Sequence, residues 1–167
     1  MTSAPDHGNT EALRTIGHGR SSRWPAIEKA FRKIHPQCVC CAVPSTRHVQ
    51  IHHRFPFHYC VALGRPDLEL DVRNLITLCE GPRASDPDHH LLIGHLADWQ
   101  SADLDVAEAA ITFRGMSEAE IRKDPRWIMK VAARLRPLDQ MTGKDKIAFT
   151  QRMNATFPKM AAHSSRD

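Results

Sequence analysis

The residue types that could do chemistry in this chain are cysteine and histidine. The 167 residues include five cysteines and eleven histidines. Three of the cysteines lie in "CVCC" at 38–41, and six of the histidines lie between residues 48 and 90. An odd number of cysteines argues against a disulfide framework, and reducing conditions keep thiols available as thiolate ligands. The pattern therefore favours a metal site.

Two adjacent histidines end the short segment "VQIHH" at 49–53. Neighbouring side chains on a strand point to opposite faces, so His52 and His53 cannot have the same role if the strand continues through them. By this alternation His53 shares the face of Val49 and Ile51, which is directed at the domain, and His52 lies on the other face. Each ring then has its own direction.

The candidate residues are spread over four short stretches of sequence, of which "CVCC" is the first. In chain order they are Cys38, Cys41, His52, His53, Asn74, Cys79, His89 and His90. The stretches "HHRFPFH", "LELDVRNLITLCE" and "HHLLIGHL" contain most of them. Their order resembles the HNH endonuclease family, in particular the bacterial subgroup with a zinc-binding cysteine frame, over roughly residues 20 to 105. The resemblance implies an α+β fold with a ββα-metal core, a structural zinc, and flanking helices at both ends.

The resemblance also implies catalytic roles. His52 corresponds to a ligand of the catalytic ion and His53 to the general base, and a neutral imidazole can take a proton from water at neutral pH. His90 corresponds to the second protein ligand of the ion. Asn74 corresponds to the central asparagine of the family, whose amide would pin the loop and help to orient the His53 ring.

His95, Arg54 and His58 are further candidates with open alternatives. His95 follows His90 by five residues, which separates the two by about 140 degrees on a regular helix. If Gly94 breaks the helix, His95 could reach the metal or the substrate; otherwise it is a helix-end histidine bonded to backbone. Arg54 and His58 are candidate substrate-binding residues, and the alternatives are an exposed arginine and a histidine that fixes a loop.

The zinc frame departs from the usual family pattern. The family commonly has a second Cys-x-x-Cys, whereas here no cysteine follows Cys79 by three residues, and His89 precedes His90. Zinc accepts three thiolates and one imidazole in a tetrahedral site. The predicted structural zinc ligands are Cys38, Cys41, Cys79 and His89. Cys40 remains an alternative to one of its neighbours, and burial as apolar filler remains the alternative for all the cysteines.

The first half of the chain must position these residues. The apolar spacing from Trp24 predicts a helix, with Pro25 at its first position and Pro36 at its end. Residues 38–53 are expected to form a cysteine turn followed by a hairpin whose second strand contains Val49 and Ile51. We expect residues 54–71 to form a long ordered loop. Residues 72–81 are expected to form a short buried strand that leads into Cys79.

Helices are expected in the second half. Asp86 as N-cap and Pro87 at the first position predict a helix to about Gln100, with Leu92, Leu96 and Trp99 on one face. Residues 117–135 and 142–153 predict two further amphipathic helices. The predicted organisation is a disordered leader at 1–20, a nuclease core with its N-terminal helix at 21–115, and a basic helical extension at 116–167.

The distribution of basic residues along the chain is consistent with a polyanionic partner. The formal net charge is +4, and residues 20–36 have five Lys and Arg against one acid. From residue 116 onward there are eleven Lys and Arg against six Asp and Glu. Such flanks could face nucleic acid, although most individual charges are equally consistent with solvated helix faces. No apolar run is long enough to span a bilayer and the N-terminus lacks a secretory signal, so we expect a cytoplasmic protein with no membrane partner.

The predicted function is metal-dependent hydrolysis of DNA phosphodiester bonds, by a histidine general base and one divalent ion. The cofactors are Zn²⁺ as the structural ion and Mg²⁺ or Mn²⁺ as the catalytic ion, and the partner is duplex DNA, intact, nicked or branched. One alternative is a zinc-stabilised nucleic-acid-binding module that does not cleave, and another is a histidine-rich metal sensor. The sequence does not define the oligomeric state.

Overall fold

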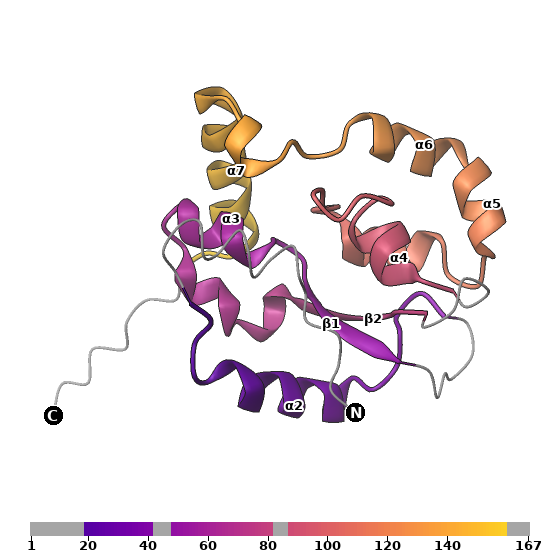
Figure 1. Cartoon of the computed structure of the whole chain (residues 1–167), viewed down its shortest axis with the longest axis horizontal. Coiled ribbons are helices and arrows are strands. Elements are labelled where there is room, and N and C mark those ends of the chain that lie inside the picture. The colour runs from indigo at the N-terminus through magenta and orange to yellow at the C-terminus, as the bar shows by residue number, and fades with distance from the viewer. Residues whose placement is uncertain (1–18, 42–47, 82–86, 160–167) are drawn as a thin grey trace, which may run out of the picture.

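A two-stranded antiparallel sheet lies among helices in this mixed α+β protein (Figure 1). The computed structural model describes residues 19–41, 48–81 and 87–159. The predicted leader therefore lies almost entirely outside the described residues. Strands β1 (Val49–His53) and β2 (Leu75–Cys79) pair so that Val49 is opposite Cys79 and His53 is opposite Leu75. His53 and Cys79 thus belong to opposite ends of the sheet.

The connection between the strands differs from the sequence prediction. The strand at 49–53 is confirmed, and it pairs with β2. Residues 42–47, where the first strand of the predicted hairpin would fall, lie outside the described part. The long loop predicted at 54–71 is wrong, because this segment contains helix α3 (Phe57–Ala62) and the 3₁₀ turn η1 (Pro66–Glu69), followed by η2 (Val72–Asn74). Its prolines precede or occupy the first helical position, where the missing N–H costs nothing. Short helices also satisfy the backbone of a buried connection.

Helix α2 (Trp24–Ile34) covers one face of the sheet (Figure 1). It begins and ends close to the positions that the sequence predicts. Phe31 from this helix is buried against Ile51 and Leu75, one residue from each strand. Trp24 and the half-buried Ile27 pack against the same cluster. This helix therefore holds the strand face from which His53 projects.

The main core lies on the other face of the sheet. It combines β2 with the π-turn η3 (His90–Gly94) and with α4 (Val106–Thr112), α5 (Glu118–Lys123) and α6 (Pro125–Ala132). The predicted helix at 117–135 is broken into α5 and α6, because the Pro125 ring cannot continue a helix and Asp124 instead caps the next one.

The helix predicted from Pro87 to Gln100 is mostly wrong. Its helical part ends at Gly94, and Leu96 and Ala97 follow with φ angles of 52° and 62°. Leu92 and Leu96 are buried, but Trp99 is 45% exposed and does not share their face. The left-handed backbone after η3 turns the chain back before a second helical turn can form.

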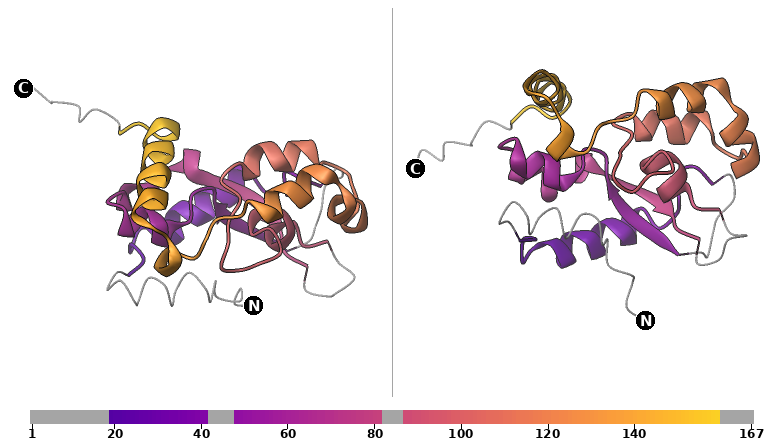
Figure 2. Two further views of the ribbon diagram at one scale, coloured as in Figure 1. Left: turned by 90° about the horizontal axis from the view of Figure 1, so that it is seen from above. Right: turned by 45° about the horizontal axis from the view of Figure 1, so that its top comes forward.

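The last helix packs against the residues that follow β1. Helix α7 (Gly143–Thr156) begins with a capping box of Thr142 and Asp145 and follows the short turn η4 (Leu138–Gln140). The cluster that α7 shares with α3 includes Phe55, Phe57, Tyr59, Cys60, Leu68, Phe149, Met153 and Phe157. Figure 2 shows α7 standing beside α3. The described part of the C-terminal segment therefore shares a core with α3 and with Phe55, which follows β1. No helix among the described residues is long and apolar enough to cross a membrane.

Candidate metal centres

Four ligand side chains converge at one end of the sheet. They are Cys38, Cys41, Cys79 and His89, and their ligand atoms all lie within 4.8 Å of one another. The Sγ atoms of Cys41 and Cys79 are 3.8 Å apart, and His89 Nδ1 lies 3.5 Å from Cys38 Sγ and 3.6 Å from Cys41 Sγ. Tetrahedral zinc with Zn–S of about 2.3 Å and Zn–N of about 2.0 Å requires separations of roughly 3.8 and 3.6 Å. The cluster could therefore hold a structural zinc ion.

Local structure brings these four groups together without a second Cys-x-x-Cys. Cys79 ends β2, and the backbone N–H of Val39, between Cys38 and Cys41, donates to the Thr77 carbonyl. Hydrogen bonds from the Cys41 and Cys79 side chains lower the pKa of the Cys38 thiol, which favours the thiolate that a metal binds.

Cys40 does not belong to this group of ligand atoms. Its side chain is fully buried, and its thiol donates to the Phe113 carbonyl over 3.7 Å. Burial is the largest influence on this thiol and raises its pKa. Cys40 is thus a core residue, and the alternative in which it replaces a neighbouring ligand is not the arrangement found.

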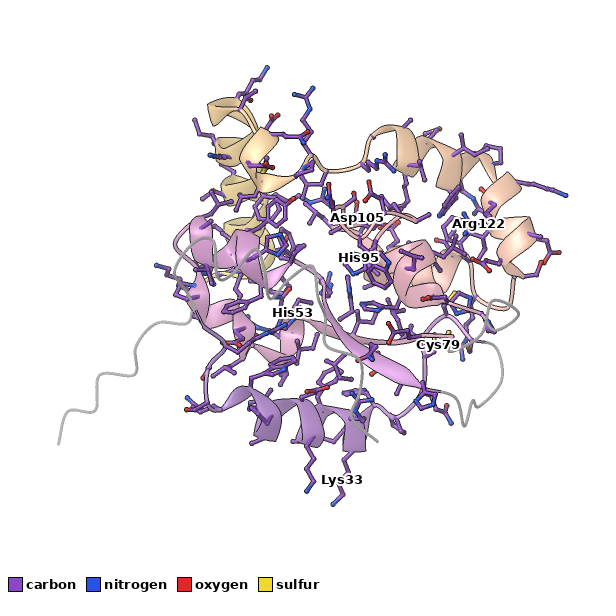
Figure 3. All side chains as sticks on the ribbon, in the orientation of Figure 1. Lys33, His53, Cys79, His95, Asp105 and Arg122 are labelled. Carbon is purple, nitrogen blue, oxygen red and sulfur yellow. The ribbon has the colours of Figure 1, made fainter. Side chains whose placement is uncertain are left out.

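A second cluster consists of His52, His90 and His95, whose ligand atoms also lie within 4.8 Å of one another. The ring centroids are 4.9 to 5.1 Å apart, and each pair of rings meets edge to face. Figure 3 shows His95 on the side of the sheet where α4 lies, and His53 and Cys79 toward opposite ends of the sheet. Three imidazoles at this distance could hold a second metal ion.

The π-turn explains why His90 and His95 meet. On a regular α-helix, five residues would place the two rings about 140 degrees apart. In η3 the N–H of His95 instead donates to the His90 carbonyl over 3.1 Å, which is the i to i+5 bond of a π-helix. The wider turn returns residue 95 to the side of residue 90.

Neighbouring groups hold the three rings in place. His95 Nδ1 lies 2.8 Å from the Ser101 carbonyl, so that nitrogen is the donor and Nε2 is the atom able to bind a metal. Gly94 allows the π-turn to approach β1, because a Cβ there would lie 3.1 Å from His52 Cε1. Trp127 Nε1 donates to the Leu92 carbonyl over 3.0 Å and so binds α6 to the same turn.

His52 has the properties of a metal ligand. Its Nε2 is buried and has no hydrogen-bond partner within the described part of the chain. Burial, followed by repulsion from the charged forms of His95, His90 and His53, holds the pKa of His52 well below its ordinary value of 6.5. The ring is therefore neutral at pH 7, the form that binds a cation.

His53 lies on the opposite face of β1 from His52, as strand alternation predicts. Its ring is 5% exposed, and its centroid lies 4.7 Å from that of Trp24 and 6.0 Å from that of Phe57. Nε2 lies 3.0 Å from the Glu69 carbonyl. With Nε2 as the donor, Nδ1 is the ring nitrogen that can accept a proton.

Asn74 is fully buried and fixes the backbone around His53. Its Oδ1 accepts from the Phe55 N–H over 2.8 Å, and its Nδ2 donates to the carbonyls of Phe55 and Leu68 over 3.2 and 3.1 Å. Leu68 directly precedes Glu69, which binds the His53 ring. The amide thus joins the backbone after β1 to the residue before Glu69, whose carbonyl lies against the His53 ring.

Neither candidate substrate-binding residue belongs to the two clusters of ligand atoms. Arg54 donates to the Arg73 carbonyl over 3.2 Å, and its guanidinium lies over the Phe157 ring. His58 is half-buried on α3 beside Tyr59, with ring centroids 4.4 Å apart. Both remain predictions as substrate contacts.

Sequence reasoning missed Ser101, Trp127 and Glu69 as supports of the sites. Ser101 and Glu69 act through backbone carbonyls, which leave no signal in residue type. Trp127 lies on a predicted amphipathic helix, so its apolar side was expected to be buried, but the hydrogen bond from its indole to the Leu92 carbonyl depends on tertiary packing.

No family model, curated protein or solved structure matches this chain.

Proposed function

We propose that this protein is a metal-dependent nuclease of the HNH, or ββα-metal, class, and that it hydrolyses DNA phosphodiester bonds. The observation that carries the proposal is the His52, His90 and His95 cluster, which is built from one strand of a two-stranded sheet and from the helical turn packed on it. The Cys₃His cluster next to this turn supports the same assignment, since the adjacent residues His89 and His90 belong one to each cluster.

The three histidines would hold the catalytic ion. Bound there, a divalent ion would supply Lewis-acid stabilisation of the phosphate and of the leaving oxygen, and three protein ligands leave coordination positions for oxygen atoms. Three imidazoles without a carboxylate suit a transition ion such as Ni²⁺ or Zn²⁺ better than Mg²⁺. The Cys₃His cluster would hold the structural zinc.

His53 would be the general base. Its Nδ1 takes a proton from a water molecule, and the water oxygen forms a bond to phosphorus while the bond from phosphorus to the 3′ oxygen breaks. The leaving oxygen receives a proton from solvent, which gives a 3′ hydroxyl and a 5′ phosphate. The Glu69 carbonyl holds the tautomer, and Asn74 holds the loop that carries Glu69. His52 and His53 are adjacent at the end of β1 but lie on its opposite faces, so the phosphate would approach across that end of the strand.

Plasmid nicking tests this proposal. Purified protein with Mn²⁺ or Mg²⁺ should nick supercoiled DNA, and EDTA should stop the reaction. His53→Ala should abolish nicking while the zinc content and the fold are retained. His48→Ala is the matched control, because His48 is an exposed histidine outside both clusters. Nicking by His53→Ala at the rate of the unmodified protein would remove His53 from the role. Salt-sensitive DNA binding without any nicking would instead identify a non-cleaving binding module.

A further inference from the structure

Trp99 stands directly beside the histidine cluster. Its ring centroid lies 4.8 Å from that of His95 and 5.2 Å from that of His90. Leu96 and Ala97, with their positive φ angles, return the chain so that the indole comes over these two rings. Left-handed conformations are costly for residues other than glycine and persist where the surroundings enforce them, often at functional sites.

The exposure of Trp99 distinguishes it from a packing residue. Trp127, which braces the same π-turn, is 8% exposed, whereas Trp99 is 45% exposed. The described structure thus already contains a buried tryptophan with a structural role at this turn. Trp99 instead presents a large aromatic surface to solvent next to three candidate metal ligands. Arg134 pairs with Asp98, the residue that precedes Trp99, over 3.5 Å.

We propose that Trp99 stacks on an unpaired nucleobase next to the phosphodiester bound at the histidine cluster, an inference that rests on the proposed function. Bases stack on exposed aromatic side chains without requiring a particular sequence, because every base has a π-face. The short distances from Trp99 to His90 and His95 restrict the stacked base to the nucleotide that carries the bound phosphate or to its neighbour.

This geometry selects a class of substrate. Inside an intact duplex both faces of each base are covered by neighbouring base pairs, so an indole fixed on the protein surface has no face to contact. A base has an exposed face at a single-stranded end, at a gap or flap, or after it has been flipped out. The preferred substrate is therefore single-stranded or gapped DNA rather than intact duplex.

Equilibrium binding tests the inference independently of cleavage. Affinities of full-length protein with bound zinc are measured by fluorescence anisotropy, without added divalent ions, for a labelled oligothymidylate, for a gapped duplex and for an intact duplex. A gel of the same samples confirms that the DNA is uncut. Trp99→Ala should weaken binding of the oligothymidylate and the gapped duplex by about tenfold or more, and that of the intact duplex by less than about twofold. Trp99→Phe should restore most of the loss.

Intrinsic fluorescence gives a second measurement that does not depend on the alanine variant. The oligothymidylate should quench the emission of the unmodified protein, and Trp99→Phe should lose most of this quenching although Trp24 and Trp127 remain. Ile147→Ala, which removes an exposed apolar side chain from α7, is the control and should bind all three DNAs as the unmodified protein does. Unchanged affinity of Trp99→Ala, or an equal loss on all three DNAs, would overturn the inference. A protein that shows the Trp99-dependent preference but, with Mn²⁺ or Mg²⁺ added, cuts neither the plasmid nor the oligothymidylate nor the gapped duplex would overturn the proposed function alone.

Discussion

Gly94 offers a direct test of how the histidine cluster is built. It lies in the π-turn, where a Cβ would be 3.1 Å from His52 Cε1, 3.2 Å from Leu78 Cδ1 and 3.3 Å from His52 Nδ1. Both neighbours are buried, at 4% and 0% exposure, so neither can move into solvent. Gly94→Ala should therefore push the His52 ring away from the turn.

The magnitude follows from two opposing terms. Alanine is favoured over glycine in a helix by about 1 kcal/mol, while overpacking a closed site costs about 1–3 kcal/mol. The net expectation is a protein less stable by about 0–2 kcal/mol. Displacement of a ligand ring should lower the affinity of the histidine cluster for Mn²⁺ or Ni²⁺ by about tenfold or more, the usual cost of disturbing the groups that orient metal ligands.

Urea unfolding and calorimetric metal titration would measure both effects. Gly143→Ala is the matched control, because Gly143 lies at the start of α7 and a Cβ there meets nothing within 4 Å. The control should be as stable as the unmodified protein or slightly more so, with unchanged metal affinity. If Gly94→Ala behaves like Gly143→Ala in both measurements, the close packing of the π-turn on His52 does not position the ligand.

Two further predictions concern the cysteines. Cys41→Ser should lose the tightly bound zinc, whereas Cys40→Ser should keep one equivalent of zinc by elemental analysis. The reason is that, of these two cysteines, only Cys41 belongs to the Cys₃His cluster. Zinc loss from Cys40→Ser would contradict the ligand set. Burial raises the pKa of Cys60 from an ordinary value of 9.0 to about 12, so the folded state keeps this thiol neutral where the unfolded state ionises. The free energy of unfolding should therefore be unaffected by this group below pH 9 and should fall by about 1.4 kcal/mol per pH unit from about pH 9 toward 12. Cys60→Ala should lack this contribution to the slope, and equal slopes above pH 9 would refute it.

Local sequence was sufficient for several elements near the sites. Helical spacing and two prolines defined the helix at 24–34, and a short apolar run defined the strand that ends at Cys79. Alternation along a strand was enough to predict that His52 and His53 face in opposite directions. Zinc chemistry and the order of Cys38, Cys41, Cys79 and His89 were enough to predict a ligand set whose members the structure brings together.

The tertiary structure decided what depends on contacts between distant residues. A strand at 49–53 could be predicted, but its pairing with β2 is a non-local choice made by burial of the apolar faces of both strands. The position of His95 depends on a π-turn that is stabilised from outside, by Trp127 on α6, by the Ser101 carbonyl and by close packing on His52. Helical periodicity assumes a regular α-helix, so it placed His95 and Trp99 on the wrong sides of the segment. Residue types and spacing thus determined which groups could bind metal, and packing determined the backbone that brings them within reach of one ion.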